Sequence, residues 1–304
     1  MRLITRADWD GLVCAVLLSS VEHVEAIQFA YPKDIQDGKV LVPENSVIAN
    51  LPYHPNCVLW FDHHSSEDDF GAPMAAFTSV PGKFGMAPSA ARLIYDHYHG
   101  DSNDKINRFQ ELVAATDRID SAQLTTDDVL NPRDYVLLSY TVDPRTGLKD
   151  IELQMYFIML IDLLKTKPLA EILHVPEVKL MVERLHAEDE TYREALLKYS
   201  RVEGNVVVTD FRGLANIPPG NRFIIYTLFP QVNVSARLFD GRDGAISTIS
   251  LGHSIFNRTC NTNVGKLLAE YGGGGHKGAG TAQFPKAEAE AKFQEIIARL
   301  KAAG

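Results

Sequence analysis

The sequence has few cysteines, no signal-peptide pattern and no apolar run long enough to cross a membrane, and each absence excludes a class of protein. Cys14, Cys57 and Cys260 are an odd number of widely separated cysteines without a Cys-x-x-Cys pair, which argues against a disulfide framework and fits a reducing compartment. Acidic residues begin within eight positions of the N-terminus, unlike in a signal peptide. The apolar run 155–164 is broken by Asp162 and falls far short of the ~20 residues that a membrane span requires. We therefore expect a cytoplasmic protein without a membrane partner.

Positive charge is also scarce, with 30 Lys and Arg residues against 39 Asp and Glu residues and a formal net charge of −9. A protein that coats long nucleic acid needs a broad cationic surface, so we do not expect long duplex nucleic acid as a partner. The same balance is compatible with a small anionic substrate that is held locally by metal ions and a few arginines.

The length of 304 residues favours two domains, because single domains usually span ~100–200 residues. Short apolar runs alternate with helical stretches over the first hundred residues, as in a parallel sheet with helical crossovers. A mostly helical region follows, and strand-like segments return after residue 200. The sequence thus predicts an α/β protein with a mostly parallel N-terminal sheet and flanking helices, a helical connection and a smaller C-terminal α/β domain. We expect the two domains to span 1–200 and 201–304.

The expected elements follow from apolar periodicity and from helix-start residues. In the first domain we expect strands at 3–4, 40–42, 46–49 and 58–61, and helices at 12–20, 90–98, 107–115 and 176–199. In the second domain we expect strands at 205–209, 223–226, 231–237 and 245–251, and a helix at 263–271. Ligand sites of open parallel sheets lie in loops at the C-terminal ends of the strands, so the loops after these strands are the candidate sites.

Two groups of polar residues lie in such loops. The segment TRADWDG carries Asp8 and Asp10, whose carboxylates can converge if the loop is extended. The segment WFDHHSS carries Asp62, His63 and His64 directly after an apolar run. Imidazole ligands suit Mn, Fe, Co or Zn, whereas Mg and Ca prefer oxygen ligands. These residue types therefore indicate a site for a transition metal.

A further acid is expected to join them from the helical region. Asp117 ends the apolar stretch 112–116 and is our preferred candidate, while Asp120, one turn later, competes with it. Each motif alone has an ordinary explanation, such as turn chemistry for acids beside glycine, a surface histidine pair or a solvated helix end. In this order along one chain, however, they predict a metal centre that distant segments assemble.

Asp-x-Asp-Gly, then Asp-His-His, then a later Asp resembles the DHH phosphoesterase family, and the segment YGGGGHKGAG at 271–280 strengthens the resemblance. Members of that family include single-strand exonucleases, oligoribonucleases, cyclic-dinucleotide hydrolases and exopolyphosphatases. The resemblance covers nearly the full length. It implies a metal-binding N-terminal domain and a DHH-associated C-terminal domain that holds substrate in a cleft between the two.

The resemblance also implies roles for individual residues in the N-terminal domain. One or two divalent ions, usually Mn²⁺, would be held by Asp8, Asp10, His63 and Asp117. Asp62 and His64 would be the catalytic residues of the triplet, either orienting the ligands or contacting substrate.

The glycine run has a physical use of its own. Consecutive glycines cost stability in a regular element, but they let backbone N–H groups approach an anion closely. We expect Gly273, Gly274, Gly275 and His276 to bind substrate phosphate, together with Arg258. A plain flexible turn is the alternative.

Two positions depart from the family pattern on the metal-binding side. Arg6 stands where many members have a histidine, and arginine cannot ligate a metal. Asn50, a metal-adjacent position, stands where an aspartate normally bridges two ions. Because two divalent ions roughly 3.5–4 Å apart need anionic bridges, we expect one strongly held Mn²⁺ and a weak or absent second site. Arg6 would then bind substrate phosphate or form a salt bridge with Asp8 or Asp10. His54 is a candidate replacement ligand, although a rigid loop explains it more simply.

The sequence therefore predicts a metal-dependent phosphoesterase that hydrolyses a phosphodiester or phosphoanhydride bond in a small phosphorylated substrate. Nucleotides, short single-stranded oligonucleotides and polyphosphate all meet this description. The alternative is a catalytically weakened regulatory module that binds nucleotide or phosphate without turnover, and Arg6 and Asn50 favour it.

Overall fold

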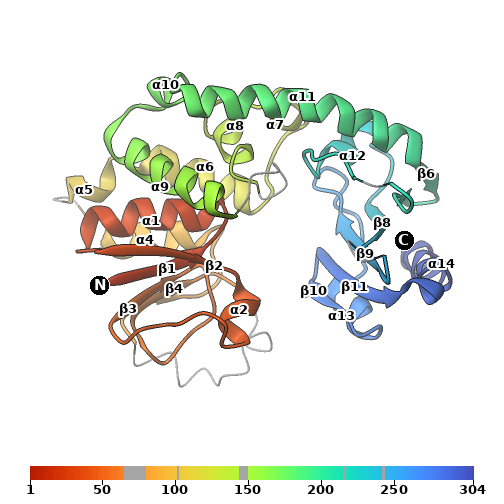
Figure 1. Cartoon of the computed structure of the whole chain (residues 1–304), viewed down its shortest axis with the longest axis horizontal. Helices are drawn as coiled ribbons and strands as arrows, with labels where there is room; N and C mark the ends of the chain where they lie inside the picture. Colours follow the sequence, from red (N-terminus) through yellow and green to blue (C-terminus); the bar gives the residue numbers. More distant parts are fainter. Residues whose placement is uncertain (65–79, 101–102, 144–149, 215, 242–243) are drawn as a thin grey trace. The chain divides into compact units, whose positions relative to one another are not determined.

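The chain forms two compact units in a computed structural model, which describes residues 1–64, 80–100, 103–143, 150–214, 216–241 and 244–304 (Figure 1). The N-terminal unit comprises residues 1–123 and 133–182, and the C-terminal unit comprises residues 124–132 and 183–304. The division falls between residues 182 and 183, inside helix α11 (Pro176–Tyr199). The boundary expected near residue 200 lies at the C-terminal end of the same helix.

The N-terminal unit contains a five-stranded parallel sheet in the order β2-β1-β3-β4-β5. This confirms the predicted parallel sheet. The strands are β1 (Arg2–Arg6), β2 (Ala26–Ala30), β3 (Ser46–Ala49), β4 (Cys57–Asp62) and β5 (Gly82–Phe84).

Alternate residues of the strands supply two separate cores, as a period of two dictates. Leu3, Val47 and Phe61 point to one face and pack with α1 (Trp9–Val21) in the larger core. Ile4 and Trp60 point to the other face and join a smaller core that includes Ile35 of α2 (Pro32–Gln36). Helix α1 is buried along most of its length, which explains why its sequence LVCAVLL is apolar on all sides.

Further helices of this unit complete the larger core, and α4, α5, α6 and α9 among them contact α1 directly. They are α4 (Ala90–Tyr98), α5 (Asp104–Asn107), α6 (Gln110–Asp120), α8 (Asp134–Tyr140), α9 (Asp150–Thr166) and α10 (Leu169–Ile172). Two of them position the candidate site, because α4 begins and α6 ends beside the loop that follows β1.

The C-terminal unit is built on a six-stranded mixed sheet in the order β10-β11-β9-β8-β7-β6. Its strands are β6 (Ser200–Glu203), β7 (Val206–Asp210), β8 (Val234–Asp240), β9 (Ile246–His253), β10 (Gly274–His276) and β11 (Ala279–Pro285). Helices α13 (Val264–Ala269) and α14 (Lys286–Ala303) pack on the sheet through a shared apolar core. Helices α7 (Thr126–Leu130) and α12 (Ile224–Leu228) also belong to this unit and contact each other.

Two predicted strands are wrong. Residues 40–42 form no strand, because Pro43 follows with no N–H for a ladder and the Val42 carbonyl accepts from the Asn56 side chain instead. Residues 223–226 lie at the start of α12 rather than in a strand. The Asn221 side chain accepts from the Phe223 N–H and turns the chain into that helix. A short buried apolar run has the same sequence pattern in a strand as in a helix.

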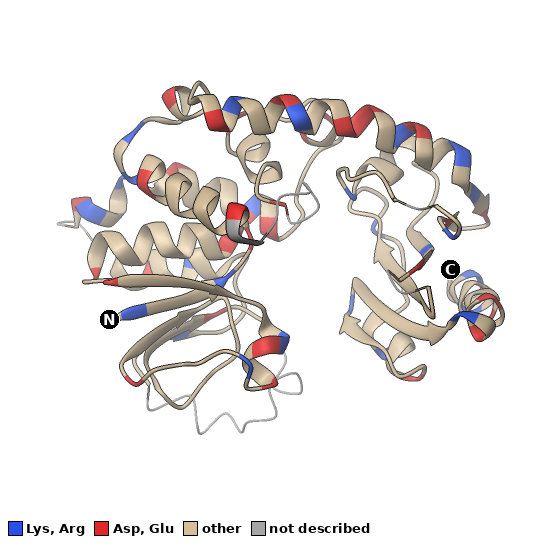
Figure 2. Cartoon of the chain, in the orientation of Figure 1, with Lys and Arg blue, Asp and Glu red and all other residues tan. Residues whose placement is uncertain are grey.

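Charged residues of both signs alternate along α11 (Figure 2). Arg184 and Glu188, for example, pair one turn apart with a distance of 2.8 Å between Nε and Oε1, as on a solvated helix face. No helix in the described part of the chain is long and apolar enough to span a membrane.

Candidate metal centre and glycine-rich segment

The loop between β1 and α1 places two aspartates at the edge of the parallel sheet. Asp8 is the N-cap of α1, and its Oδ1 accepts from the Gly11 N–H at 2.9 Å. A Cβ atom on Gly11 would lie 2.0 Å from the carbonyl oxygen of Arg6, so only glycine permits this turn. Asp10 follows in the first helical turn and is 1% exposed.

Helix α4 fixes the Asp10 carboxylate through its first backbone amides. Ala90 N–H donates to Oδ2 at 2.8 Å and Ala91 N–H donates to Oδ1 at 2.9 Å. Burial raises the pKa of Asp10 to about 6, although nearby His63 and the two N–H groups oppose the rise. A buried carboxylate that is only partly neutralised by hydrogen bonds is suited to a cation.

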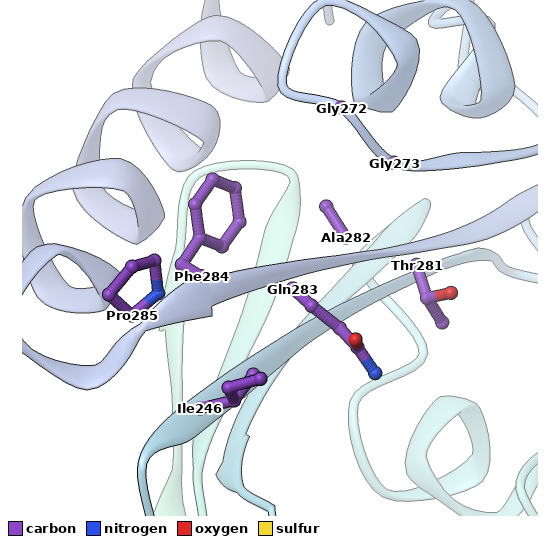
Figure 3. Close-up of a pocket in the computed structure, with 8 residues that line it drawn as sticks. All are labelled: Ile246, Gly272, Gly273, Thr281, Ala282, Gln283, Phe284 and Pro285. Carbon is purple, nitrogen blue, oxygen red and sulfur yellow. The ribbon is translucent and has the colours of Figure 1, made fainter.

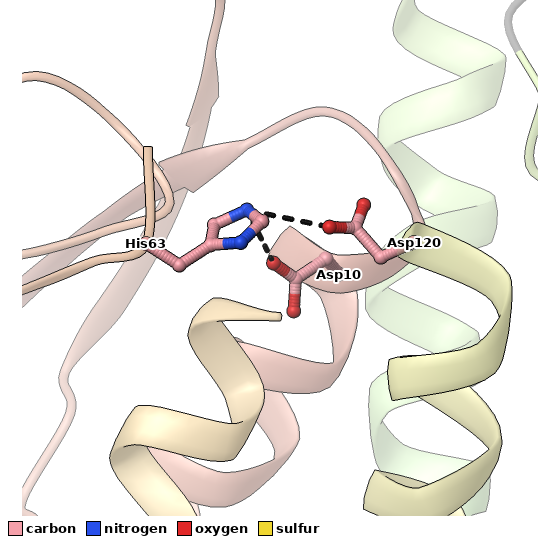
Figure 4. Close-up of side chains that lie close together, drawn as sticks. All are labelled: Asp10, His63 and Asp120. Carbon is pink, nitrogen blue, oxygen red and sulfur yellow. Dashed lines mark ion pairs between the residues drawn. The ribbon is translucent and has the colours of Figure 1, made fainter. Parts of the chain in front are cut away.

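His63 faces this carboxylate with a defined ring nitrogen. Its Nδ1 lies 3.1 Å from the carbonyl oxygen of Ala87, and a carbonyl can only accept, so Nδ1 carries the proton. The other ring nitrogen, Nε2, faces Asp10 Oδ2, 3.8 Å away, and Asp120 Oδ2, 3.3 Å away (Figure 4). This arrangement, with the second ring nitrogen bound to a carbonyl, is typical of a histidine that ligates a metal.

Asp10, His63 and Asp120 therefore form a group in which one ligand atom of each residue lies within 4.8 Å of the others. The structure brings together two of the four predicted ligands, Asp10 and His63, and adds Asp120. First-row divalent ions bind such atoms at ~2.0–2.2 Å, so one ion can contact two ligand atoms that are ~4 Å apart. The donor set fits a single divalent ion.

Asp117 and Asp8, the other two predicted ligands, are engaged elsewhere. Asp117 Oδ2 accepts from Arg92 Nε at 2.9 Å and Nη2 at 2.6 Å, and Oδ1 accepts from Ser89 Oγ at 2.7 Å. Because Ser89 also caps α4, Asp117 ties the end of α6 to the start of α4. Asp8 Oδ2 lies 2.8 Å from Arg6 Nε.

The first acid of the triplet orients both histidines. Asp62 Oδ1 accepts from the His63 N–H at 3.0 Å and lies 2.7 Å from His64 Nδ1. Its other oxygen, Oδ2, is buried without a hydrogen-bond partner within the described segments. His64 Nε2 lies 3.3 Å from Arg6 Nη1, so both of its ring nitrogens are engaged. Asp62 and His64, predicted to be catalytic, lie directly beside the metal group.

Asn50, at the end of β3, adds a second unsatisfied oxygen. Its Nδ2 donates to Asp8 Oδ1 at 3.1 Å, while its Oδ1 is buried and has no partner among the described residues. Its backbone has a φ of 54°, a conformation that asparagine tolerates better than most residues. Two orphaned buried oxygens beside the Asp10 group support a cation site. His54 lies outside the group, and its Nδ1 accepts from the Asn56 N–H.

The glycine run of the C-terminal unit has structural reasons at most of its positions. A Cβ on Gly273 would lie 2.4 Å from the carbonyl oxygen of Thr281, and a Cβ on Gly275, at φ 151°, would lie 2.3 Å from that of Ala279. Gly274 differs, because its φ is ordinary and no atom lies within 4 Å of its added Cβ. The fold therefore requires no glycine at 274.

The other residues predicted to bind substrate lie on exposed parts of the same unit. His276 ends β10, and its Nδ1 accepts from the Gly278 N–H at 3.2 Å. Arg258 Nε donates to the Ile255 carbonyl at 2.9 Å. A surface hollow borders Gly272 and Gly273 and is lined further by Ile246, Thr281, Ala282, Gln283, Phe284 and Pro285 (Figure 3). None of these lining side chains is charged.

Sequence reasoning missed the groups that hold the ligands. These are the Ala87 carbonyl and the α4 amides, and the pairing of Arg92 with Asp117 was missed as well. The helix-start signal Pro88-Ser89 marks where α4 begins, but nothing in the sequence shows that its free N–H groups meet an aspartate 80 residues earlier. The sequence favours Asp117 over Asp120, whereas the structure brings Asp120 to the group.

No protein-family profile matches the sequence, and no curated protein matches it. Among solved structures, a pGpG-specific phosphodiesterase, PggH, from Vibrio cholerae is 39% identical, has a TM-score of 0.83, and is matched over 100% of this chain and 99% of that one. An exopolyphosphatase-related protein from Bacteroides fragilis shares the fold at 14% identity and a TM-score of 0.52, over 99% of this chain and 92% of that one. RecJ from Thermus thermophilus in complex with Mn²⁺ also shares the fold, at 14% identity and a TM-score of 0.54, over 99% of this chain and 51% of that one.

Proposed function

We propose that this chain, which belongs to the DHH phosphoesterase family and is a phosphoester hydrolase, acts with a bound metal ion and that its substrate is pGpG or a closely related short 5′-phosphorylated dinucleotide. The full-length identity to a pGpG-specific phosphodiesterase is the observation that carries the substrate. The Asp10–His63–Asp120 group supports the chemistry, since it retains the donor set that a divalent ion needs.

We assign the three residues as the ligands of one divalent ion, with Mn²⁺ the first candidate. A bound ion of this kind lowers the pKa of water and offsets charge on phosphoryl oxygens. Asp10 is held by the α4 amides and His63 by the Ala87 carbonyl, so the protein sets the direction of both ligands before an ion arrives. Asp62 fixes the adjacent histidine rings and acts as a positioning residue.

A second, strongly held ion is not part of the proposal. Two acids remain near the group. Asp62 orients the two histidines, and the oxygens of Asp8 are already bound by Arg6, Gly11 and Asn50. A further divalent ion would have to displace the guanidinium and approach the first ion without an anionic bridge, which is electrostatically unfavourable.

The C-terminal unit would bind the non-reacting part of the substrate through its glycine-rich segment. Gly274 offers backbone approach, and His276 and Arg258 are exposed polar groups of the same unit. Their proposed ligand is a phosphate or ribose group of the dinucleotide.

Turnover of pGpG by the purified chain tests the proposal. With Mn²⁺ we expect release of GMP from pGpG, slower hydrolysis of bis-p-nitrophenyl phosphate and little release of phosphate from polyphosphate. His63→Ala removes a ligand, and we expect it to lose at least ~10²-fold in kcat/KM while circular dichroism stays unchanged. His23→Ala, at an exposed histidine that does not belong to the metal group, is the matched control.

Retained activity in His63→Ala would show that the assigned centre is wrong. Tight binding of pGpG without hydrolysis, in Mn²⁺, Mg²⁺ and Co²⁺ alike, would favour a regulatory module instead. Preferred hydrolysis of polyphosphate would keep the reaction class and overturn the substrate.

A further inference from the structure

Arg6, the last residue of β1, is held in place from two sides. Its Nε lies 2.8 Å from Asp8 Oδ2, and its Nη1 lies 3.3 Å from His64 Nε2. A guanidinium fixed through two of its three nitrogens has lost most of the freedom of an exposed arginine. It is therefore organised in advance for a ligand.

The chemistry of Arg6 and Asp62 decides which nitrogen of the His64 ring donates a hydrogen bond and which accepts one. An arginine N–H is always a donor, so His64 Nε2 must offer its lone pair to Nη1. His64 Nδ1–H then donates to Asp62, whose Oδ1 is 2.7 Å away.

The third nitrogen of the guanidinium, Nη2, has no protein partner in the described part of the chain, and the side chain is 36% exposed. The guanidinium is linked to the metal group through His64, because Nη1 contacts the His64 ring and the centroid of that ring is 4.5 Å from that of His63. An arginine with one free edge beside a cation site is suited to a planar or tetrahedral oxyanion.

Charge supports the same assignment. One divalent ion together with one guanidinium offsets three of the four carboxylates of Asp8, Asp10, Asp62 and Asp120. The protein thus already contains a fixed positive charge where Asp8 would otherwise be open to a second ion. Substrate phosphate then brings the negative charge that a free N–H edge and an incompletely coordinated ion attract.

On the basis of the proposed function, we propose that Arg6 is a catalytic residue whose Nη2 edge binds a non-bridging oxygen of the scissile phosphate. It exchanges no proton, and its effect is electrostatic. Water attacks phosphorus and gives up a proton, the bond from phosphorus to the 3′-oxygen of the leaving GMP breaks, and that oxygen takes up a proton. The negative charge on the phosphoryl oxygens is stabilised by a group that needs no reorganisation.

The test compares Arg6→Gln and Arg6→Lys with Arg2→Gln, which changes an exposed arginine at the other end of the same strand. For Arg6→Gln we expect a loss of about 10²–10³-fold in kcat/KM for pGpG, the range seen on removal of one oxyanion donor. Arg6→Lys restores the charge without the fork, so we expect partial recovery. Arg2→Gln should match the wild type.

Two further readouts do not depend on turnover. We expect the Mn²⁺ content to stay at one equivalent per chain in Arg6→Gln, because Arg6 is not a ligand. Calorimetric titration of pGpG into metal-free protein in EDTA should show affinity weakened by at least ~10-fold in Arg6→Gln relative to Arg2→Gln.

A rescue experiment measures activity. In Arg6→Ala, a few millimolar guanidinium should restore part of the activity, whereas the same concentration of sodium should not.

A merely structural arginine gives a different pattern. If Arg6→Gln keeps kcat/KM within about threefold of Arg2→Gln, or gains activity together with a second equivalent of Mn²⁺, the inference is overturned. Failure of the wild type to hydrolyse pGpG would instead contradict the proposed substrate, and the same comparison with bis-p-nitrophenyl phosphate would then decide the role of Arg6.

Discussion

Substitution of Asp120 and of Asp117 separates two acids that lie one turn apart in α6. Asp120 Oδ2 is 3.3 Å from His63 Nε2, whereas Asp117 is bound by Arg92 and Ser89. Two ligand atoms that both touch an ion at ~2.1 Å lie at most ~4.2 Å apart, and 3.3 Å satisfies this limit. We therefore expect Asp120→Asn to weaken Mn²⁺ binding and Asp117→Asn to spare it.

Asp120→Asn should change the affinity for Mn²⁺, whereas Asp117→Asn should change the stability of the fold. Loss of a charged ligand should weaken Mn²⁺ affinity by at least ~10–100-fold, the range known even for residues that only support a ligand, with little change in the melting temperature of metal-free protein. Asp117→Asn leaves Arg92 without its carboxylate at a partly buried site, which should cost about 1–3 kcal/mol. For a unit of this size that corresponds to a melting temperature lower by roughly 2–10 °C.

Calorimetric titration with Mn²⁺ and thermal unfolding in EDTA measure the two effects independently. If Asp117→Asn lost the metal while Asp120→Asn retained it, the ligand assignment drawn from the structure would be refuted. The preference for Asp117 that the sequence suggested would then be restored.

Three other predictions follow from geometry in the same way. Burial raises the pKa of Asp10 to about 6, so a proton competes with the ion below that pH. The Mn²⁺ affinity should therefore fall by about tenfold per pH unit there. Mn²⁺ titrations at pH ~7.5, ~5.5 and ~4.5 check this, and an affinity that does not change with pH contradicts it. Gly274→Ala should fold as the wild type does but raise the KM for pGpG. Gly273→Ala should lower the melting temperature, because only its new Cβ has atoms within 3 Å. Equal melting temperatures of the two variants would show that the packing argument is wrong. Ser89→Ala removes the cap of α4 and a donor to Asp117 and should cost about 1–2 kcal/mol; an unchanged denaturant midpoint would exclude that role.

Patterns of short range were predictable from the sequence. The loop acids after β1 and the triplet after β4 belong to parallel strands of one sheet, and the ends of such strands meet at one edge. The buried helix after the loop followed from an unbroken apolar run. These features depend on neighbours in the chain, which is why single-sequence reasoning reached them.

The choice between Asp117 and Asp120 was not predictable in the same way. Both residues lie on adjacent turns of α6, and which of them meets His63 depends on how deeply the helix end sits against the sheet. Arg92, 25 residues earlier, binds the first of the two. No local pattern shows that pairing. The helix start at residues 223–226 was not predictable either, because it depends on the hydrogen bond of the Asn221 side chain and not on the apolar run.

The turn at Gly11 has a consequence for how the centre can vary. A Cβ there would lie 2.0 Å from the Arg6 carbonyl, so the main chain holds the strand end and the helix start together with no side chain between them. The main-chain spacing between Arg6 and Asp10 is thus set by peptide geometry. Substitutions that change the charge of Arg6 or of Asp10 would therefore alter the electrostatic potential of the metal site and leave this main-chain spacing unchanged.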